Sequence, residues 1–216
     1  MSLETGAKFG YSNWTSLPDS VKNYIETRAC TELGGLTNMF TYCQSLLLAD
    51  LDIKGNASLD RMFYNCSSLQ KVTLTNTGLT KSFSGTFSNC GKLSEVSMVV
   101  TYGSIFTSMF EGCTSLTYIP IAAPFNQDNT DCSSMYKDAG IQSKIDSSVI
   151  PNDNAIANAS YMFKNCPIPS VQNLEMPVCH NMTGMFENDN PVTAVLTSVG
   201  KISSGYCKVM DSMFKG

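Results

Sequence analysis

Nine cysteines and one histidine are the side chains of this 216-residue sequence with the clearest capacity for chemistry. A zinc or redox centre would need CxxC pairs or interleaved histidines. The sequence has no CxxC pair, and its one histidine, His180, stands directly beside Cys179. Neighbouring residues rarely direct both side chains at one substrate, and no motif supplies an Asp or Asn to orient the imidazole. We therefore predict no catalytic residue, no cofactor and no metal centre, and a protein that is not an enzyme.

Oxygen ligands gather in the stretch Pro124 to Lys144. Asn126, Asp128, Asn129 and Asp131 lie close together there, and their oxygens are of the kind that calcium binds. The glycine and glutamate spacing of an EF-hand loop does not follow them. We therefore favour an ordinary polar loop over a weak calcium site and assign no metal.

Composition and charge restrict the class of partner. Charged residues make up 15% of the chain, whereas Ser (27), Thr (19) and Asn (17) together supply 63 positions, which favours binding by shape and hydrogen bonds. With 14 basic against 18 acidic residues, the chain has no electrostatic footprint for a nucleic acid. No run of about 18 apolar residues is present, and the start has no secretory signal pattern. We expect neither nucleic-acid binding nor membrane insertion.

Five of the cysteines recur at one position of an internal repeat. A Met-Phe pair, or a close variant, returns eight times at spacings of 23, 24, 23, 26, 27, 23 and 28 residues: Met39-Phe40, Met62-Phe63, Thr86-Phe87, Met109-Phe110, Met135-Tyr136, Met162-Phe163, Met185-Phe186 and Met213-Phe214. A cysteine stands four residues after the first member of the pair at Cys43, Cys66, Cys90, Cys113 and Cys166. Eight copies at a nearly constant period indicate a repeat protein.

The recurring cysteines are predicted to form one column, one thiol for each repeat. Buried thiols that pack as small hydrophobic groups are the favoured interpretation, and disulfides between neighbouring repeats are the alternative. Cys30, Cys132, Cys179 and Cys207 lie outside the column and are the better candidates for exposed or paired thiols.

Each repeat is predicted to combine a short helix with a short strand. Leu36, Met39, Phe40 and Cys43 stand at offsets 0, 3, 4 and 7, which trace one face of a two-turn helix. After the cysteine, apolar residues alternate with polar ones in the two-residue period of a strand. The strand patterns are Leu69-x-x-Val72-x-Leu74, Leu93-x-x-Val96-x-Met98 and Leu116-x-x-Ile119-x-Ile121, with shifted versions at Ala49 to Ile53 and Val171 to Met176.

One repeat cannot fold alone. About six buried apolar side chains contribute roughly 10–15 kcal/mol, whereas ordering about 24 residues costs roughly 1–2 kcal/mol each. Stacking lets the strands pair and lets each apolar face be covered by the next repeat. The predicted fold class is an α/β repeat, a solenoid of about eight units of 23–28 residues. Because a helix is wider than a strand, its parallel sheet is predicted to be concave.

The repeats resemble those of a known family. "MFYNCSSLQKVTL" and "MFEGCTSLTYIPI", with lead-ins such as "NMTGMF", are similar to the BspA-type leucine-rich repeats of bacterial surface proteins, over residues 36 to 216. The resemblance implies a solenoid associated with adhesion and host interaction, in bacteria, other microbes or their viruses. It also implies a cell-surface, extracellular or virion location, and it implies no reaction.

The two ends of the chain differ from the repeats. Residues 1–35 are predicted to hold an N-terminal capping helix within 14–29, ahead of the solenoid at 36–216, with a looped insertion at about 124–150. The last repeat is predicted to be incomplete. Met213 and Phe214 would then be exposed at an open end, where self-association or a larger assembly is possible.

The side chains between the buried strand residues are the predicted ligand-binding residues. They are Asp50, Asp52, Lys71, Thr73, Glu95, Ser97, Tyr118, Asn173 and Glu175. From these we predict a recognition or adhesion module that binds a protein or glycan ligand, with a host surface as a candidate location of that ligand. The alternative is a structural subunit of a virion or surface assembly whose C-terminal repeat docks another chain.

Overall fold

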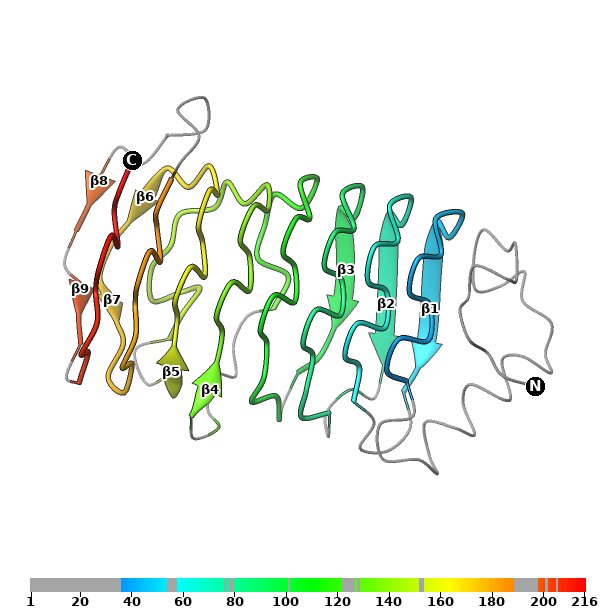
Figure 1. Ribbon diagram of the computed structural model, residues 1–216, viewed down its shortest axis with the longest axis horizontal. Helices are drawn as coiled ribbons and strands as arrows, with labels where there is room; N and C mark the ends of the chain where they lie inside the picture. The colour runs from blue at the N-terminus through cyan, green and yellow to red at the C-terminus, as the bar shows by residue number, and fades with distance from the viewer. Residues whose placement is uncertain are drawn as a thin grey trace.

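The computed structural model describes most of the chain from residue 36 onward. The described residues are 36–53, 58–75, 77, 80–100, 102–121, 127, 129–151, 154–188, 198–200, 202–204 and 206–216. The predicted capping helix, Cys30, Asn126 and Asp128 lie outside them. Figure 1 shows the described chain as a row of stacked rungs, each built by one repeat.

Three parallel strands form one side of the first rungs. β1 (Leu48–Asp52), β2 (Lys71–Thr75) and β3 (Glu95–Met98) pair in that order. Val72 pairs with Ala49 on one side and Val96 on the other, and all three are buried. The strands predicted from alternation in the first three repeats are therefore confirmed, and their inward side chains form columns that run from rung to rung.

Shorter pairings continue the stack. β4 (Thr130–Asp131) pairs with β5 (Ile156–Asn158), β6 (Ser170–Val171) with β8 (Ser198–Val199), and β7 (Leu174–Glu175) with β9 (Ile202–Ser203), all in parallel. In Figure 1, β4 and β5 point in the opposite direction to β1, β2 and β3, as the two sides of a flattened coil should. Single bridges extend the β4–β5 side in both directions, and we call this side the lead-in ladder: Ser82, Ile105, Asp131, Asn158, Asn181 and Val209.

The strand predicted to end at Ile121 does not form. Pro120 has no N–H to donate to a ladder. The Tyr118 hydroxyl lies against the edge of β3 instead, where it accepts a hydrogen bond from Val96 N at 3.0 Å and faces Val96 O at 3.3 Å. The sheet therefore ends at β3, with one phenol in place of the backbone of a fourth strand.

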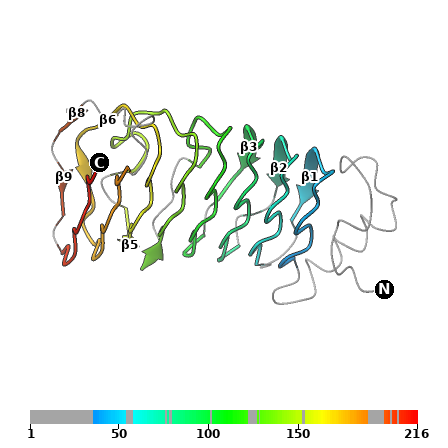
Figure 2. The ribbon, with the colours of Figure 1, turned by 45° about the horizontal axis from the view of Figure 1, so that its top comes forward.

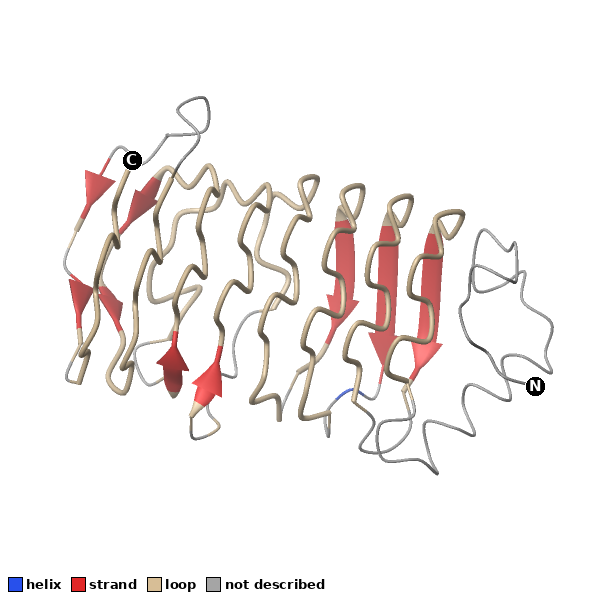
Figure 3. Ribbon diagram, viewed as in Figure 1, coloured by secondary structure: helices blue, strands red, loops and turns tan. Residues whose placement is uncertain are grey.

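The helices predicted for the repeats do not form in the described ranges. The segments around the Met-Phe pairs are chains of tight turns instead, drawn as loops in Figure 3. Their N–H groups alternate between two partners: Met39 N bonds Leu36 O three residues back at 3.2 Å, and Phe40 N bonds Met62 O of the next rung at 2.8 Å. In most rungs the residue immediately before the Met position and the residue three positions after it have positive φ, as at Arg61 (52°) and Asn65 (59°) on either side of Met62. An α-helix has negative φ throughout and bonds four residues back.

The apolar offsets could not distinguish the two structures, because the turns bury the same positions that a helix face would bury. Leu59, Met62, Phe63 and Cys66 are all fully buried. A turn chain is as thin as a strand and can pair with the next rung on its own side of the coil. The wide helix that led us to expect a concave sheet is therefore missing, and Figure 2 shows narrow ribbons on both sides of the stack.

Substitutions at Asn65 distinguish turn from helix. At φ 59° glycine is free of strain, whereas a β-branched side chain is strained by about 1–2 kcal/mol. We expect Asn65→Gly to leave the free energy of unfolding within about 0.5 kcal/mol of the wild type, and Asn65→Val to lower it by about 1–2 kcal/mol. Urea denaturation measures both. A helix would give the opposite order, because glycine is the poorer helix former.

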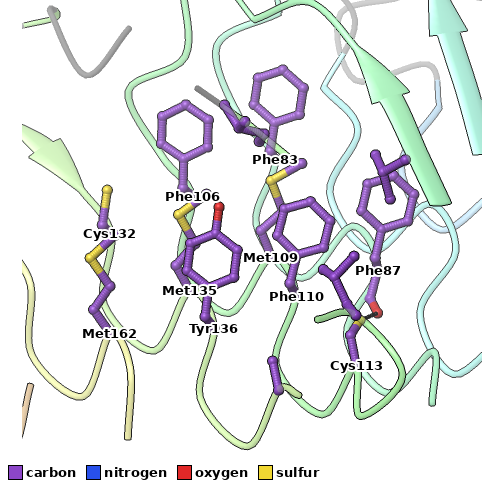
Figure 4. Close-up of a cluster of buried hydrophobic side chains, with 14 of the residues drawn as sticks. Phe83, Phe87, Phe106, Met109, Phe110, Cys113, Cys132, Met135, Tyr136 and Met162 are labelled. Carbon is purple, nitrogen blue, oxygen red and sulfur yellow. Dashed lines mark hydrogen bonds between the residues drawn. The ribbon is translucent and has the colours of Figure 1, made fainter. Parts of the chain in front are cut away.

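Aromatic rings form a continuous stack through the core. Consecutive ring centroids are 5.3 to 5.6 Å apart and the planes lie within 13° of parallel, through Phe40, Phe63, Phe87, Phe110, Tyr136, Phe163, Phe186 and Phe214. A second stack lies beside it, in which the ring centroids of Phe83 and Phe106 are 5.4 Å apart (Figure 4). The stack continues through the rung of Tyr136, which lies within the predicted insertion at 124–150, and Ile145 and Ile150 of that region are also buried.

Tyr136 carries a polar atom into this stack. Its hydroxyl is buried and has no hydrogen-bond partner among the described residues. Because an unsatisfied buried hydroxyl costs about 1–3 kcal/mol, Tyr136→Phe should raise the free energy of unfolding by about 1 kcal/mol or more. Tyr118→Phe is the matched control, since it deletes a hydroxyl that does bond backbone, and it should lower that free energy. Calorimetric melting of both variants tests the opposite signs.

Candidate interaction surface

The outward side chains of β1, β2 and β3 form three registered rows, which we call the strand-face patch. The rows are Leu48, Lys71 and Glu95; then Asp50, Thr73 and Ser97; then Asp52 and Thr75. They alternate with buried residues along each strand, so they are exposed or half-buried. The structure thus brings six of the predicted ligand-binding residues onto one surface.

The rows differ in how far their polar groups are already paired. Lys71 Nζ lies 2.8 Å from Glu95 Oε2, and this hydrogen bond raises the pKa of the Lys71 ammonium. Both side chains are more than half exposed, so the pair adds little stability. Thr75 donates to Asp52 Oδ1 at 2.9 Å. Because Lys71 and Glu95 cancel in charge, the two aspartates leave the patch acidic.

The middle row is the part of the patch with unused hydrogen-bonding capacity. Within the described ranges, the side chains of Asp50, Thr73 and Ser97 make no hydrogen bond. Their register places one carboxylate and two hydroxyls side by side at the spacing of paired strands, about 4.8 Å. Such a row can bond several donors of an extended partner at once.

Three predicted residues lie outside the patch. Tyr118 belongs to the next rung, and its hydroxyl is engaged with β3. Asn173 lies between β6 and β7 with a left-handed backbone (φ 49°), and Glu175 is in β7. Asn173 and Glu175 are exposed but are separated from β3 by the rungs of Tyr118 and Ile145.

Leu48 is a patch residue that the sequence interpretation missed. It begins the first row, beside Lys71, and its side chain is exposed. Three consecutive leucines, Leu46 to Leu48, obscured the two-residue alternation of the strand. Leu48 lies two residues before Asp50 and therefore points outward, as Asp50 and Asp52 do. An exposed leucine next to the acidic row gives the patch an apolar margin.

The recurring cysteines form the predicted column of packed thiols. Four of the five thiols donate to the carbonyl oxygen of an aromatic residue in the preceding rung: Cys66 to Phe40 at 3.0 Å, Cys90 to Phe63 at 3.0 Å, Cys113 to Phe87 at 3.1 Å and Cys166 to Tyr136 at 2.9 Å. All eight cysteines of the described ranges are free.

The prediction that Cys132 and Cys179 are exposed or paired is wrong. Both are buried free thiols, and only Cys207 is half-buried. Cys132 is buried because it stands three residues before Met135, the position that Leu59 and Phe106 fill in other rungs.

Thiol labelling tests whether any cysteine is reactive. Burial raises the pKa of Cys113 and Cys166 to about 12 each, so their thiolates are scarce near neutral pH. The other described cysteines except Cys207 are buried as well, which keeps a reagent away from them in the native protein. In a Cys30→Ser, Cys207→Ser variant at pH 8, we expect iodoacetamide to label the native protein at least about 100-fold more slowly than the urea-unfolded protein. One rapidly labelled cysteine in the native state would contradict this and point to a nucleophile.

The parallel rungs, the ring stack and the outward strand rows define a solenoid repeat protein. The chain belongs to the BspA-type leucine-rich repeat family, whose model matches six copies over residues 36–169. The ring stack extends the same architecture beyond the matched residues, to Phe214. Membership in this family suggests a protein-interaction or adhesion module, and such proteins are typically surface-associated and non-enzymatic.

No curated protein and no solved structure matches the chain significantly. Among the described residues, no helix is long and apolar enough to cross a membrane. The same residues contain no group of three or more His, Cys, Asp or Glu side chains arranged to hold a metal ion.

Proposed function

We propose that this protein is a non-enzymatic recognition or adhesion module that binds a protein or glycan at a cell surface through the strand-face patch. The observation that supports this most directly is the middle row, Asp50, Thr73 and Ser97. These groups are exposed or half-buried, are held in register by paired strands, and make no hydrogen bond within the described ranges.

The patch favours a partner of particular chemistry. Asp50 and Asp52 leave it acidic, so a segment that carries Lys or Arg side chains is complementary. Leu48 supplies an apolar contact at one margin, next to the weakly held Lys71–Glu95 pair, which a partner can displace. Because rigid strands carry all of these groups, little conformational entropy is lost when they bind.

The test removes the middle row without touching the core. Flow cytometry measures how the fluorescently labelled chain binds to cultured epithelial cells. The triple variant Asp50→Ala, Thr73→Ala, Ser97→Ala is compared with the wild type in this assay. We expect at least a tenfold loss of apparent affinity, since three directional contacts are lost at once.

A matched control carries the same residue types elsewhere on the surface. Asp211→Ala, Thr37→Ala, Ser67→Ala removes one carboxylate and two hydroxyls from exposed positions outside the patch. This variant should bind cells as the wild type does. Equal binding by both triple variants would overturn the proposed role of the strand face.

The assembly-subunit alternative is favoured by a different observation. The ring stack ends at Phe214, which is 42% exposed, and Met210 of the same rung is also exposed. Met213, the other predicted contact, is only 7% exposed, so Phe214 is the informative residue. If a second copy covers this ring, light scattering will show a dimer or larger assembly that Phe214→Glu dissociates and the control Tyr102→Glu leaves intact. A wild-type monomer would remove this alternative.

A further inference from the structure

A surface hollow lies around β5, which belongs to the lead-in ladder, on the side of the coil opposite the strand-face patch. The position of β5 can be followed in Figure 1. The volume of the hollow is about 350 Å³. Four successive rungs line it through Asn129, Ala155, Ala157, Val178, His180 and Tyr206. A hollow of this size is at the lower end of the range for small-molecule sites.

The hollow exists because small side chains of one rung are flanked by larger ones. Ala155 and Ala157 form its floor on either side of the buried Ile156. Asn129 belongs to the preceding rung and lines one side of the hollow. Val178 and His180 belong to the following rung and line the other side. Backbone hydrogen bonds hold the three rungs in place, from Thr130 N to Ala155 O at 3.1 Å and from His180 N to Ala157 O at 2.8 Å.

Hydrogen bonds from a buried side chain inside the coil also hold the floor of the hollow in place. The buried Asn154 amide donates to Pro151 O at 2.7 Å and to Glu175 O at 2.8 Å, and its Oδ1 accepts from Ile156 N at 3.3 Å. These bonds fix the start of β5 and hence the positions of both alanines. The shape of the hollow is therefore set before any ligand arrives, which reduces the ordering cost of binding.

The lining combines one open aromatic ring with two unused polar groups. Tyr206 is 67% exposed, the most of any aromatic side chain among the described residues. The His180 imidazole and the Asn129 amide are also exposed, and neither makes a side-chain hydrogen bond within the described ranges. Among the described residues, no Lys, Arg, Asp or Glu lines the hollow.

We propose that this hollow binds a neutral hexopyranose unit of a glycan. The C–H face of the sugar ring would lie on the electron-rich face of Tyr206. Its hydroxyls would bond the Asn129 amide and the His180 imidazole, which both donate and accept. Val178 and the alanine floor would contact the remaining apolar edge of the ring.

Other occupants fit less well. A nucleotide or a phosphorylated sugar would find no cation among the described lining residues to pair with its charge. An apolar peptide side chain would cover the imidazole and amide and leave both unpaired, which costs about 1–3 kcal/mol for each buried group. A neutral ring with a polar edge can pack against the apolar lining side chains and hydrogen-bond the imidazole and the amide.

Saturation-transfer difference NMR tests this directly on the full chain. The probes are the methyl glycosides of glucose, galactose, mannose and N-acetylglucosamine, with adenosine as a nucleoside control whose purine ring is not a sugar. We expect saturation transfer to the ring protons of at least one glycoside. Its intensity should fall at least fivefold in Tyr206→Ala and in His180→Ala.

Matched variants separate the site from nonspecific effects. Tyr206→Phe keeps the ring and should retain the signal, and Tyr102→Ala removes another exposed tyrosine and should not change it. Equal urea midpoints show that each variant is folded. Transfer to none of the glycosides, transfer unchanged in Tyr206→Ala, or a stronger signal for adenosine would overturn the proposal.

This hollow is independent of the proposed strand-face function. The Asp50→Ala, Thr73→Ala, Ser97→Ala variant should give the wild-type glycoside signal. Loss of cell binding in that variant and loss of glycoside binding in Tyr206→Ala are therefore separate results, and either proposal can fail alone.

Discussion

Replacing Phe110 by alanine is expected to lower the free energy of unfolding by about 3–5 kcal/mol. Phe110 is fully buried and stacks between Phe87 at 5.3 Å and Tyr136 at 5.4 Å. Removing its ring opens a cavity and takes away a partner from both neighbouring rungs. Urea denaturation followed by circular dichroism measures the loss.

The same substitution at the end of the stack is the matched control. Among the described residues Phe214 has one ring neighbour, Phe186 at 5.5 Å, and it is 42% exposed, so Phe214→Ala should cost about 1 kcal/mol or less. Because solenoid rungs are stabilised by their nearest neighbours, the central variant should also broaden the transition. Similar losses at both positions would mean that the stack does not carry the stability of the coil.

Replacing Gly140 by alanine has the second largest expected effect, a loss of about 3 kcal/mol, at the upper end of overpacking costs. A Cβ at this position would lie 3.0 Å from the carbonyl carbon of Thr114 and closer still to its oxygen. These are backbone atoms and cannot rotate away. The two rungs would have to separate, although Gly140 N bonds Cys113 O between them at 3.2 Å.

Gly91→Ala is the control for Gly140→Ala. A Cβ at Gly91 would meet Thr114 Oγ1 at 3.6 Å, an ordinary contact, and its φ is not positive. We expect the free energy of unfolding to stay within about 0.5 kcal/mol or to rise, because alanine restricts the unfolded chain. Thermal melting of both variants compares them, and a Gly140→Ala melting temperature equal to that of Gly91→Ala would contradict the close approach of the rungs.

Part of the candidate surface could be predicted from the alternation of apolar and polar residues in the sequence. Lys71 and Thr73 alternate with Val72 and Leu74, so their outward direction followed from the two-residue period of a strand. Their neighbours Asp50, Glu95 and Ser97 required only that equivalent repeats align. Tyr118 does not follow this alternation, because Pro120 prevents the strand on which Tyr118 was predicted to lie. Its hydroxyl bonds the edge of β3 instead, a contact that depends on the tertiary structure.

The hollow around β5 could not be foreseen in the same way. Asn129, Ala157, His180 and Tyr206 are spread over almost 80 residues, and no motif links them. They meet because their rungs are consecutive in the stack. A small residue between larger ones becomes a depression only when the register between rungs is known.

The sequence by itself determined the repeat, its period, the buried positions at offsets 0, 3, 4 and 7 and the first three strands, because these depend on the spacing of apolar residues along one chain. Tertiary structure alone decided that the Met-Phe segments are turns. The offsets 0, 3, 4 and 7 suit both conformations, so the outcome depends on where alternate N–H groups bond. A helix would bond them within its own rung, whereas stacked rungs offer carbonyls such as Met62 O to Phe40 N. The whole stack then gains a second ladder, and Asn and Gly at positions such as Asn65 and Gly112 adopt the left-handed backbone that the turns require.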